Sequence, residues 1–184
     1  SAFVDIDNDG DLDAFIGNNL PTGNLTFFRN TGSASSPFFS LEAGTPFGIA
    51  GATSLGAHVS FADIDKDGDL DAFLGGNSST VQFFRNTAAA GASTPQFTSE
   101  GNPFNLTIQG RPTFVDIDND GDLDAFIGNG TSGGSTVFYR NTASEGATTP
   151  LFVTESTTLG SAGLFLAMPA FADIDGAGDF DAFV

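Results

Sequence analysis

The chain has 184 residues and a net charge of −18, because 23 acidic residues face only 5 basic ones. Nucleic acid is excluded as a partner, since phosphate binding needs a basic face. A hydrophobic fraction of 40% with 21 phenylalanines excludes a disordered chain. The absence of cysteine excludes disulfides and thiolate metal sites. No apolar run reaches the length of about 18 residues that a membrane span needs.

The acidity is confined to four short segments. All nineteen aspartates lie in residues 5–13, 63–71, 116–124 and 173–181, and outside these segments four glutamates balance four arginines. Each segment follows the pattern Asp-x-Asp-x-Asp-Gly-x-x-Asp, with Ala177 in place of the third aspartate in the last one. So many carboxylates at this spacing repel one another unless a hard cation such as Ca²⁺ lies between them. Calcium binding is therefore the first function that the sequence predicts.

In chain order, the first unit begins with a short apolar segment that ends at Asp5, and the acidic loop follows. Asp-Ala-Phe-Ile-Gly at 13–17 predicts a second strand, and Phe-Phe-Arg-Asn-Thr at 27–31 predicts a third. A fourth strand is expected from Pro37-Phe38 onward. The same order returns in the later units, so we divide the chain into one array of repeats at 1–57, 58–110 and 111–167, with a partial repeat at 168–184.

Four antiparallel strands in each repeat are typical of β-propeller blades. We therefore predict an all-β fold with three full blades and a partial fourth, as part of a larger propeller or an assembly. The repeated phenylalanines are expected to fill the space between neighbouring blades, because Phe buries a large apolar area without needing a hydrogen-bond partner. The connections between repeats, which contain Phe47, Phe104 and 164–166, are expected to pack against the next unit.

Two sequence blocks carry a family resemblance. Phe-Val-Asp-Ile-Asp-Asn-Asp-Gly-Asp-Leu-Asp-Ala-Phe-Ile-Gly at 3–17 and Phe-Phe-Arg-Asn-Thr-Gly at 27–32 resemble FG-GAP/VCBS-type repeats. Such repeats are similar to the calcium-loop blades of integrin α-subunit propellers and of many bacterial secreted proteins. The resemblance covers nearly the whole chain. It implies the propeller fold and calcium, and it implies no substrate.

The loop spacing predicts how each aspartate contributes. Carboxylates at loop positions 1, 3, 5 and 9 are expected to surround one ion, with Gly10 permitting the sharp turn at position 6. Position 7 is expected to bind through its backbone carbonyl with its side chain outward, while Ile6 and Leu12 face the blade. The candidate ligands are Asp5, Asp7, Asp9, Asp11 and Asp13; Asp63, Asp65, Asp67, Asp69 and Asp71; Asp116, Asp118, Asp120, Asp122 and Asp124; and Asp173, Asp175, Asp179 and Asp181. Three strong calcium sites are expected, with the fourth weak or empty because of Ala177.

The loops are not EF-hands. An EF-hand loop ends in a bidentate Glu at position 12, where this chain has Ile16, Leu74, Ile127 and Val184. Mg²⁺ fits less well because it holds its waters, and Zn²⁺ lacks the His and Cys ligands that it prefers.

Three further sets of residues are weighed for function. The arginines at 29, 85 and 140 are interpreted as ion-pair or carbonyl contacts near each loop, with an anionic ligand as the alternative. The asparagines that follow them, at 30, 86 and 141, are interpreted as turn formers. His58, which aligns with Arg111 and Met168, is expected on an exposed propeller face, where variable residues would give specificity.

The overall expectation is a secreted or cell-surface module without catalysis, because calcium loops of this type fill at extracellular concentrations. It would act in adhesion, scaffolding or filament assembly, with itself, an extracellular protein or a glycan as partner. A glycan-binding propeller and a non-catalytic part of a polysaccharide-acting enzyme remain as alternatives. The chain begins at Ser1 without a visible signal peptide, so we expect a mature piece or a portion of a longer protein.

Overall fold

The computed structural model describes residues 1–18, 25–44, 46–49, 56–76, 80–102, 105–106, 110–129, 136–144, 146–159 and 168–183. In these residues the chain forms three four-stranded antiparallel sheets and one two-stranded sheet. Within each sheet the strands follow chain order, so that every strand pairs with its sequence neighbour. The predicted all-β fold of four-stranded blades is thus confirmed.

The first sheet comprises β1 (Ala2–Val4), β2 (Asp13–Gly17), β3 (Leu25–Asn30) and β4 (Phe39–Glu42), and a short 3-10 turn, η1 (Pro46–Gly48), follows it. The second sheet comprises β5 (His58–Ala62), β6 (Asp71–Gly75), β7 (Gln82–Asn86) and β8 (Phe97–Gly101). The third comprises β9 (Gly110–Val115), β10 (Asp124–Asn129), β11 (Thr136–Asn141) and β12 (Phe152–Leu159). The fourth comprises β13 (Ala170–Ala172) and β14 (Asp181–Phe183).

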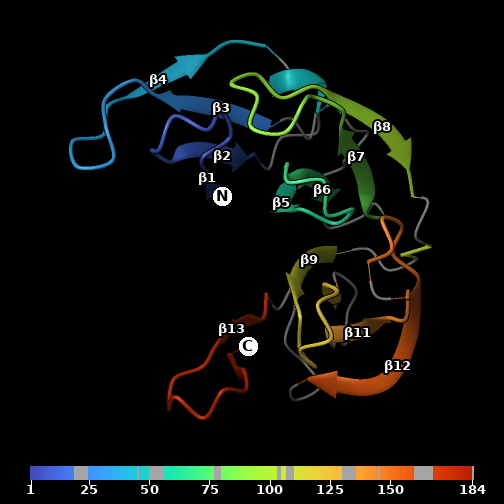
Figure 1. The fold of residues 1–184 in the computed structure, drawn as a ribbon. Helices are drawn as coiled ribbons and strands as arrows, with labels where there is room; N and C mark the ends of the chain where they lie inside the picture. The colour runs from blue at the N-terminus through green and yellow to red at the C-terminus, as the bar shows by residue number, and fades with distance from the viewer. Residues whose placement is uncertain are drawn as a thin grey trace.

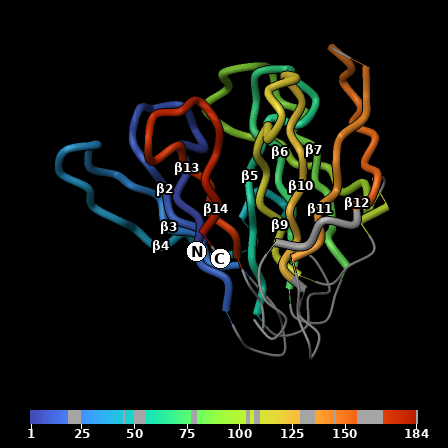
Figure 2. The backbone as a smooth tube through the Cα atoms, turned by 90° about the horizontal axis from the view of Figure 1, so that it is seen from below, coloured from blue at the N-terminus to red at the C-terminus, as the bar shows by residue number. Residues whose placement is uncertain are grey.

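The sheets stand around a common centre as an open arc (Figure 1). The first strand of each sheet lies toward the centre, whereas β4, β8 and β12 lie at the outer rim. All four acidic loops join a first strand to a second strand and lie at the same end of the sheets (Figure 2). Loops one and two line a common cavity, and loops two and three are joined by an ion pair.

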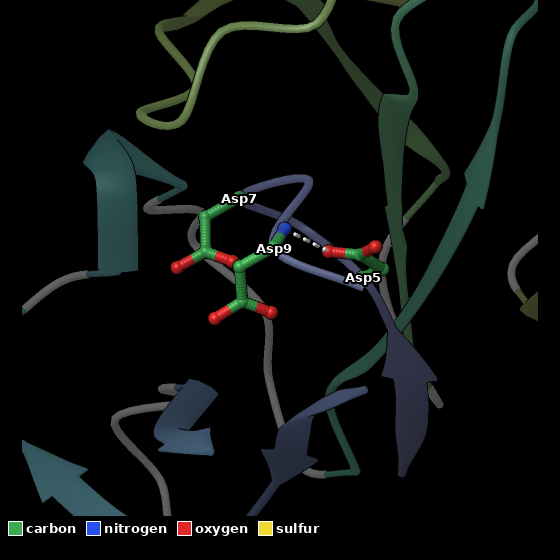
Figure 3. A group of neighbouring side chains, drawn as sticks. All are labelled: Asp5, Asp7 and Asp9. Carbon is green, nitrogen blue, oxygen red and sulfur yellow. Dashed lines mark hydrogen bonds between the residues drawn. The ribbon is translucent and has the colours of Figure 1, made fainter. Parts of the chain in front are cut away.

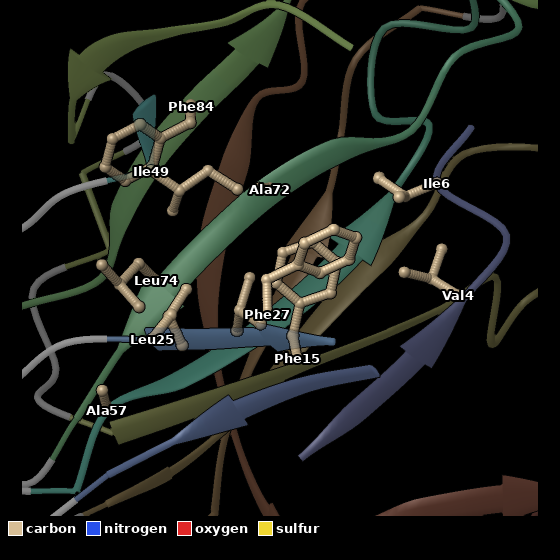
Figure 4. Packing of buried hydrophobic residues seen from close by; sticks show 11 residues of the cluster. Val4, Ile6, Phe15, Leu25, Phe27, Ile49, Ala57, Ala72, Leu74 and Phe84 are labelled. Atoms are coloured by element: carbon tan, nitrogen blue, oxygen red, sulfur yellow. The ribbon is translucent and has the colours of Figure 1, made fainter. Parts of the chain in front are cut away.

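Phenylalanines connect each sheet to the next, as predicted. The Phe of each Asp-Ala-Phe segment packs against the first Phe of the following repeat, with centroid distances of 4.9 Å for Phe15 and Phe61 and 4.6 Å for Phe126 and Phe171. Phe15 also contacts Phe27 within its own sheet, and Figure 4 shows both rings in the cluster between the first two sheets. Burial of this apolar area is the main stabilising term at each junction.

Glycine permits the closest approach between sheets. A Cβ on Gly75, at the end of β6, would lie 2.0 Å from the carbonyl oxygen of Gly110, where β9 begins. No side chain fits into this space. The final Gly of Asp-Ala-Phe-Leu-Gly thus allows the backbones of two neighbouring sheets to meet directly, and the packing of these sheets requires a residue without a Cβ here.

The apolar connection after the first sheet also behaves as predicted. Phe47, in η1, packs against Phe15 and Phe27. The other two apolar connections, at Phe104 and at 164–166, lie outside the described residues. The described part of the chain contains no helix of the length and apolar character that crosses a membrane.

Two expectations about exposure are wrong. His58 is only 7% exposed, because β5 lies between the first and third sheets, and it does not occupy an open face. Leu12 is 54% exposed and does not face the blade interior. Its equivalents Leu70 and Leu123 pack against the clusters shared with the preceding sheet, whereas no sheet formed by the described residues covers Leu12.

Candidate metal centre

Each of the first three loops is held open by hydrogen bonds to its first carboxylate. Asp5 accepts the backbone N–H of Asp9 at 3.1 Å with Oδ1 and that of Gly10 at 3.0 Å with Oδ2. Gly10 has a φ of 92°, a conformation that residues with a Cβ rarely adopt. Equivalent bonds recur in loops two and three. The Asp and Gly spacing therefore specifies the turn itself.

The turn brings carboxylates together. Oxygens of Asp5, Asp7 and Asp9 lie within 4.8 Å of one another, and Figure 3 shows the three side chains on one loop. The same three positions gather in loops two and three, as Asp63, Asp65 and Asp67 and as Asp116, Asp118 and Asp120. Positions 1, 3 and 5 of the predicted ligand set thus form a cluster in each loop.

In the first three loops the position 9 carboxylates are not part of these three-residue clusters, and they are deeply buried. Asp13, Asp71 and Asp124 are each 1% exposed. Each accepts a backbone N–H at 2.7 Å from the Asn that ends the third strand. Burial, opposed by this hydrogen bond, raises the pKa to about 6 for Asp13 and Asp124 and to about 7 for Asp71. An ionised carboxylate at this position therefore requires a compensating positive charge.

Buried oxygens without partners test whether Ca²⁺ fits. Among the described residues, one oxygen each of Asp7 and Asp13 in loop one, and of Asp65 and Asp71 in loop two, is buried without a hydrogen bond. Such atoms are costly unless a ligand satisfies them. All donors are carboxylate oxygens, which suit a hard cation. The residues present fit calcium, which would be held by positions 1, 3, 5 and 9 of each of the first three loops.

Position 7 differs from the expectation. Its side chain was predicted to point outward, but Asp11, Asp69 and Asp122 are 7%, 5% and 2% exposed. Asp11 is buried although it belongs to the first sheet, so burial at position 7 does not depend on a preceding sheet. Their backbone N–H groups donate to position 5 of the same loop at 2.9–3.0 Å.

The repeated arginine is an ion-pair residue, as interpreted from the sequence. Arg85 pairs through Nη1 with Asp65 of the loop and through Nε with Glu100 of β8 at 2.7 Å, and it lies 5.2 Å from the Phe83 ring centroid. Arg29 and Arg140 make the same contacts with the corresponding residues. Sequence reasoning missed the glutamates, although Glu42, Glu100 and Glu155 follow the arginines at similar spacings.

The repeated asparagine shapes the turn after the third strand, as predicted. Asn86 is 6% exposed, and its Oδ1 accepts backbone N–H groups of Ala88 at 3.2 Å and Gln96 at 3.0 Å. Its own N–H is the donor to Asp71. One residue thus fixes both the acidic loop and the turn beside it.

The fourth loop is built differently. Asp173, Asp175 and Asp181 lie within 4.8 Å of one another, so that position 9 replaces position 5, which is Ala177. Asp173 accepts backbone N–H groups of Gly176, Ala177 and Gly178 at 2.7–3.1 Å. All its carboxylates are exposed. A turn of the same type forms without the third aspartate, in a more solvated setting.

Comparison with known proteins agrees with this geometry. No curated protein and no solved structure matches the chain. A family model described as FG-GAP-like repeat matches residues 5–74 and 63–127, which include the first three acidic loops, nearly all of the first two sheets and the first half of the third. With two-thirds of its length matched in this way and four acidic turns on repeated β-sheets, the chain belongs to the family of FG-GAP-like repeats.

Proposed function

We propose that the chain is a calcium-stabilised, non-catalytic module that acts outside the cell in adhesion, scaffolding or surface assembly. The observation that carries the proposal is the recurrence of the three-carboxylate cluster, with buried oxygens lacking partners in the first two loops. Calcium in each loop would link the first strand of a sheet to the second. Loops of this kind fill at the calcium concentrations found outside cells.

Thermal unfolding in millimolar calcium and in chelator tests this role. Because calcium binds the folded loops and not the unfolded chain, the melting temperature should be well above its value in chelator. The variant Asp63→Asn with Asp65→Asn should reduce this difference, since it removes two carboxylates of one cluster. Identical melting temperatures in calcium and chelator would contradict the proposal.

A specific observation favours assembly through the first sheet. Ile16 is 42% exposed, whereas its equivalents Leu74 and Ile127 are 1% and 0% exposed beneath the preceding sheet. Phe3, Ala14, Ile16, Phe28 and Phe39 line an apolar groove of about 270 Å³ on this face. The same face of the second and third sheets receives another sheet of the repeat. We infer that a further sheet of the same repeat type covers it, either from a neighbouring repeat of a longer chain or from a second copy of this chain.

Sedimentation of the chain in calcium tests the assembly. We expect association that increases with protein concentration. Ile16→Asp should abolish it, because a charge would be buried in the contact. Glu42→Gln, on the exposed end of β4, should leave it unchanged. A monomer at all concentrations, or equal association by Ile16→Asp, would contradict self-assembly through this face.

A further inference from the structure

A lysine connects two acidic loops across the junction between the second and third sheets. Lys66 occupies position 4 of loop two, and its Nζ forms an ion pair with Oδ1 of Asp122, at position 7 of loop three. Asp122 is 2% exposed. The ammonium group thus supplies the positive charge that a buried carboxylate needs at this junction.

The preceding junction has the same carboxylate and no lysine. Asp69, at position 7 of loop two, is 5% exposed, and its Oδ1 accepts the N–H of Gly91 at 2.9 Å. Its Oδ2 is buried and has no hydrogen-bond partner among the described residues. Position 4 of loop one is Asn8, which is neutral and shorter than lysine. Its Nδ2 donates to the carbonyl of Ala92 at 3.3 Å, so it does not neutralise Asp69.

A small polar cavity lies at this junction. Asp69 lines it together with Asp5 and Asn8, and the remaining lining comes from Ile6, Gly68, Leu70 and Asn86. Its volume is about 40 Å³, enough for one ion or one water. Asn8 and Lys66 share a left-handed backbone, with φ of 56° and 60°, so the two junctions start from the same geometry. The two junctions differ because Lys66 places an ammonium group beside Asp122, whereas among the described residues no side chain places a positive charge beside Asp69.

We propose that this cavity is a further cation site, which shares Asp5 with the site of loop one and in which a calcium ion replaces the ammonium group that Lys66 supplies at the next junction. Asp69 Oδ2 is its principal ligand, with Asp5 and the amide oxygen of Asn8 completing a set of oxygen donors that suits a hard cation. The ion links loop one to loop two across the sheet junction. The proposed ion would bind the side chain of Asp69. The calcium site of loop two is expected to bind the backbone carbonyl of Asp69 instead.

Exchanging the position 4 residues tests the site. Bound calcium is counted by equilibrium dialysis with radioactive Ca²⁺ at saturation. Asn8→Lys should bind one ion fewer than the unmodified chain, because the new ammonium group reaches Asp69. Lys66→Asn should bind one ion more, because it opens the equivalent space beside Asp122. The double variant has the composition of the original chain and should return to its count.

Two further variants keep the test decisive. Asp69→Asn should lose one ion while retaining the backbone carbonyl that serves loop two. Ser99→Lys, on the exposed face of β8, adds the same charge as Asn8→Lys and should leave the count unchanged. Circular dichroism checks that each variant is folded. Equal calcium counts for the unmodified chain, Asn8→Lys and Asp69→Asn would overturn the proposal, even with every loop ion still bound.

Discussion

The rings of Phe73 and Phe114 lie with their centroids 4.3 Å apart across the junction between the second and third sheets. Phe73 comes from Asp-Ala-Phe of one repeat, and Phe114 opens the next repeat. Since the same pairing joins the first sheet to the second and the third to the fourth, these aromatic contacts bind the repeats into one body.

Replacing Phe73 should therefore destabilise the protein far more than the same change in the last sheet. Phe73→Ala empties a fully buried position and should cost about 3–5 kcal/mol. Phe183 holds the equivalent position and is 53% exposed, so Phe183→Ala should cost about 0.5 kcal/mol or less. Urea denaturation in calcium measures both. Similar losses in the two variants would show that the junction does not carry the stability.

Neutralising a position 9 carboxylate should have opposite effects with and without calcium. Asp71→Asn keeps an oxygen that accepts the N–H of Asn86 but removes a buried charge. In the calcium-free protein at neutral pH it should stabilise by on the order of 1–3 kcal/mol, because burial raises the pKa of Asp71 to about 7. In calcium it should lower both the affinity and the melting temperature.

Asp181→Asn provides the matched control for this variant. Asp181 holds position 9 in the fourth sheet, where it is exposed, so small changes are expected in both conditions. Calorimetric melts of the two variants, each in calcium and in chelator, make the comparison. A change of the same sign in both media for Asp71→Asn would contradict calcium binding at this carboxylate.

Replacing the repeated arginine should lower the free energy of unfolding most when calcium is absent. Arg85→Met leaves the carboxylate of Asp65, on a residue 7% exposed, without its cation, and should cost about 1–3 kcal/mol in chelator. Calcium would supply the missing charge, so the cost in calcium should be smaller. Glu100→Gln removes only the more exposed partner and should cost less than about 1 kcal/mol. Equal costs for Arg85→Met in both media would mean that Asp65 does not face the ion.

Without metal, the free energy of unfolding should fall as pH rises from about 4 to about 7. Burial raises the folded-state pKa of Asp13 and Asp124 to about 6 and that of Asp71 to about 7, so the folded chain binds more protons than the unfolded chain in this range. Burial lowers the pKa of His58 to about 4, so this imidazole makes stability rise with pH between about 4 and its usual pKa near 6.5. The three carboxylates act in the opposite direction and outweigh it. Urea midpoints in metal-free buffers should show the decrease, and a midpoint that rises with pH would be the contrary result.

The loops and the sheet junctions could be predicted because their causes are local and repeated. Gly10 and the first Asp of the loop determine the turn within a few residues, and the recurrence of Phe at equivalent places indicates a shared interface. The sequence also predicted that the repeated arginine forms an ion pair near each loop. Its glutamate partner was missed because the pairing of β7 with β8, which brings Glu100 to Arg85, cannot be read from one strand alone.

Exposure could not be predicted in the same way, since it depends on the neighbouring sheet. His58 is polar but buried at the start of β5, and Leu12 is apolar but exposed because none of the described sheets packs on its side of the first sheet. Asp69 was expected to point outward from its position in the loop, but position 7 is buried in each of the first three loops. The exposure of His58 and Leu12 thus depends on which sheets flank them, and this cannot be read from the repeat alone.

The most direct measurement is a crystal structure grown in calcium, with the anomalous signal of the ion recorded. The account predicts a peak within each of the first three loops, among Asp5, Asp7 and Asp9, among Asp63, Asp65 and Asp67, and among Asp116, Asp118 and Asp120. Loops that contain only water at saturating calcium would contradict it.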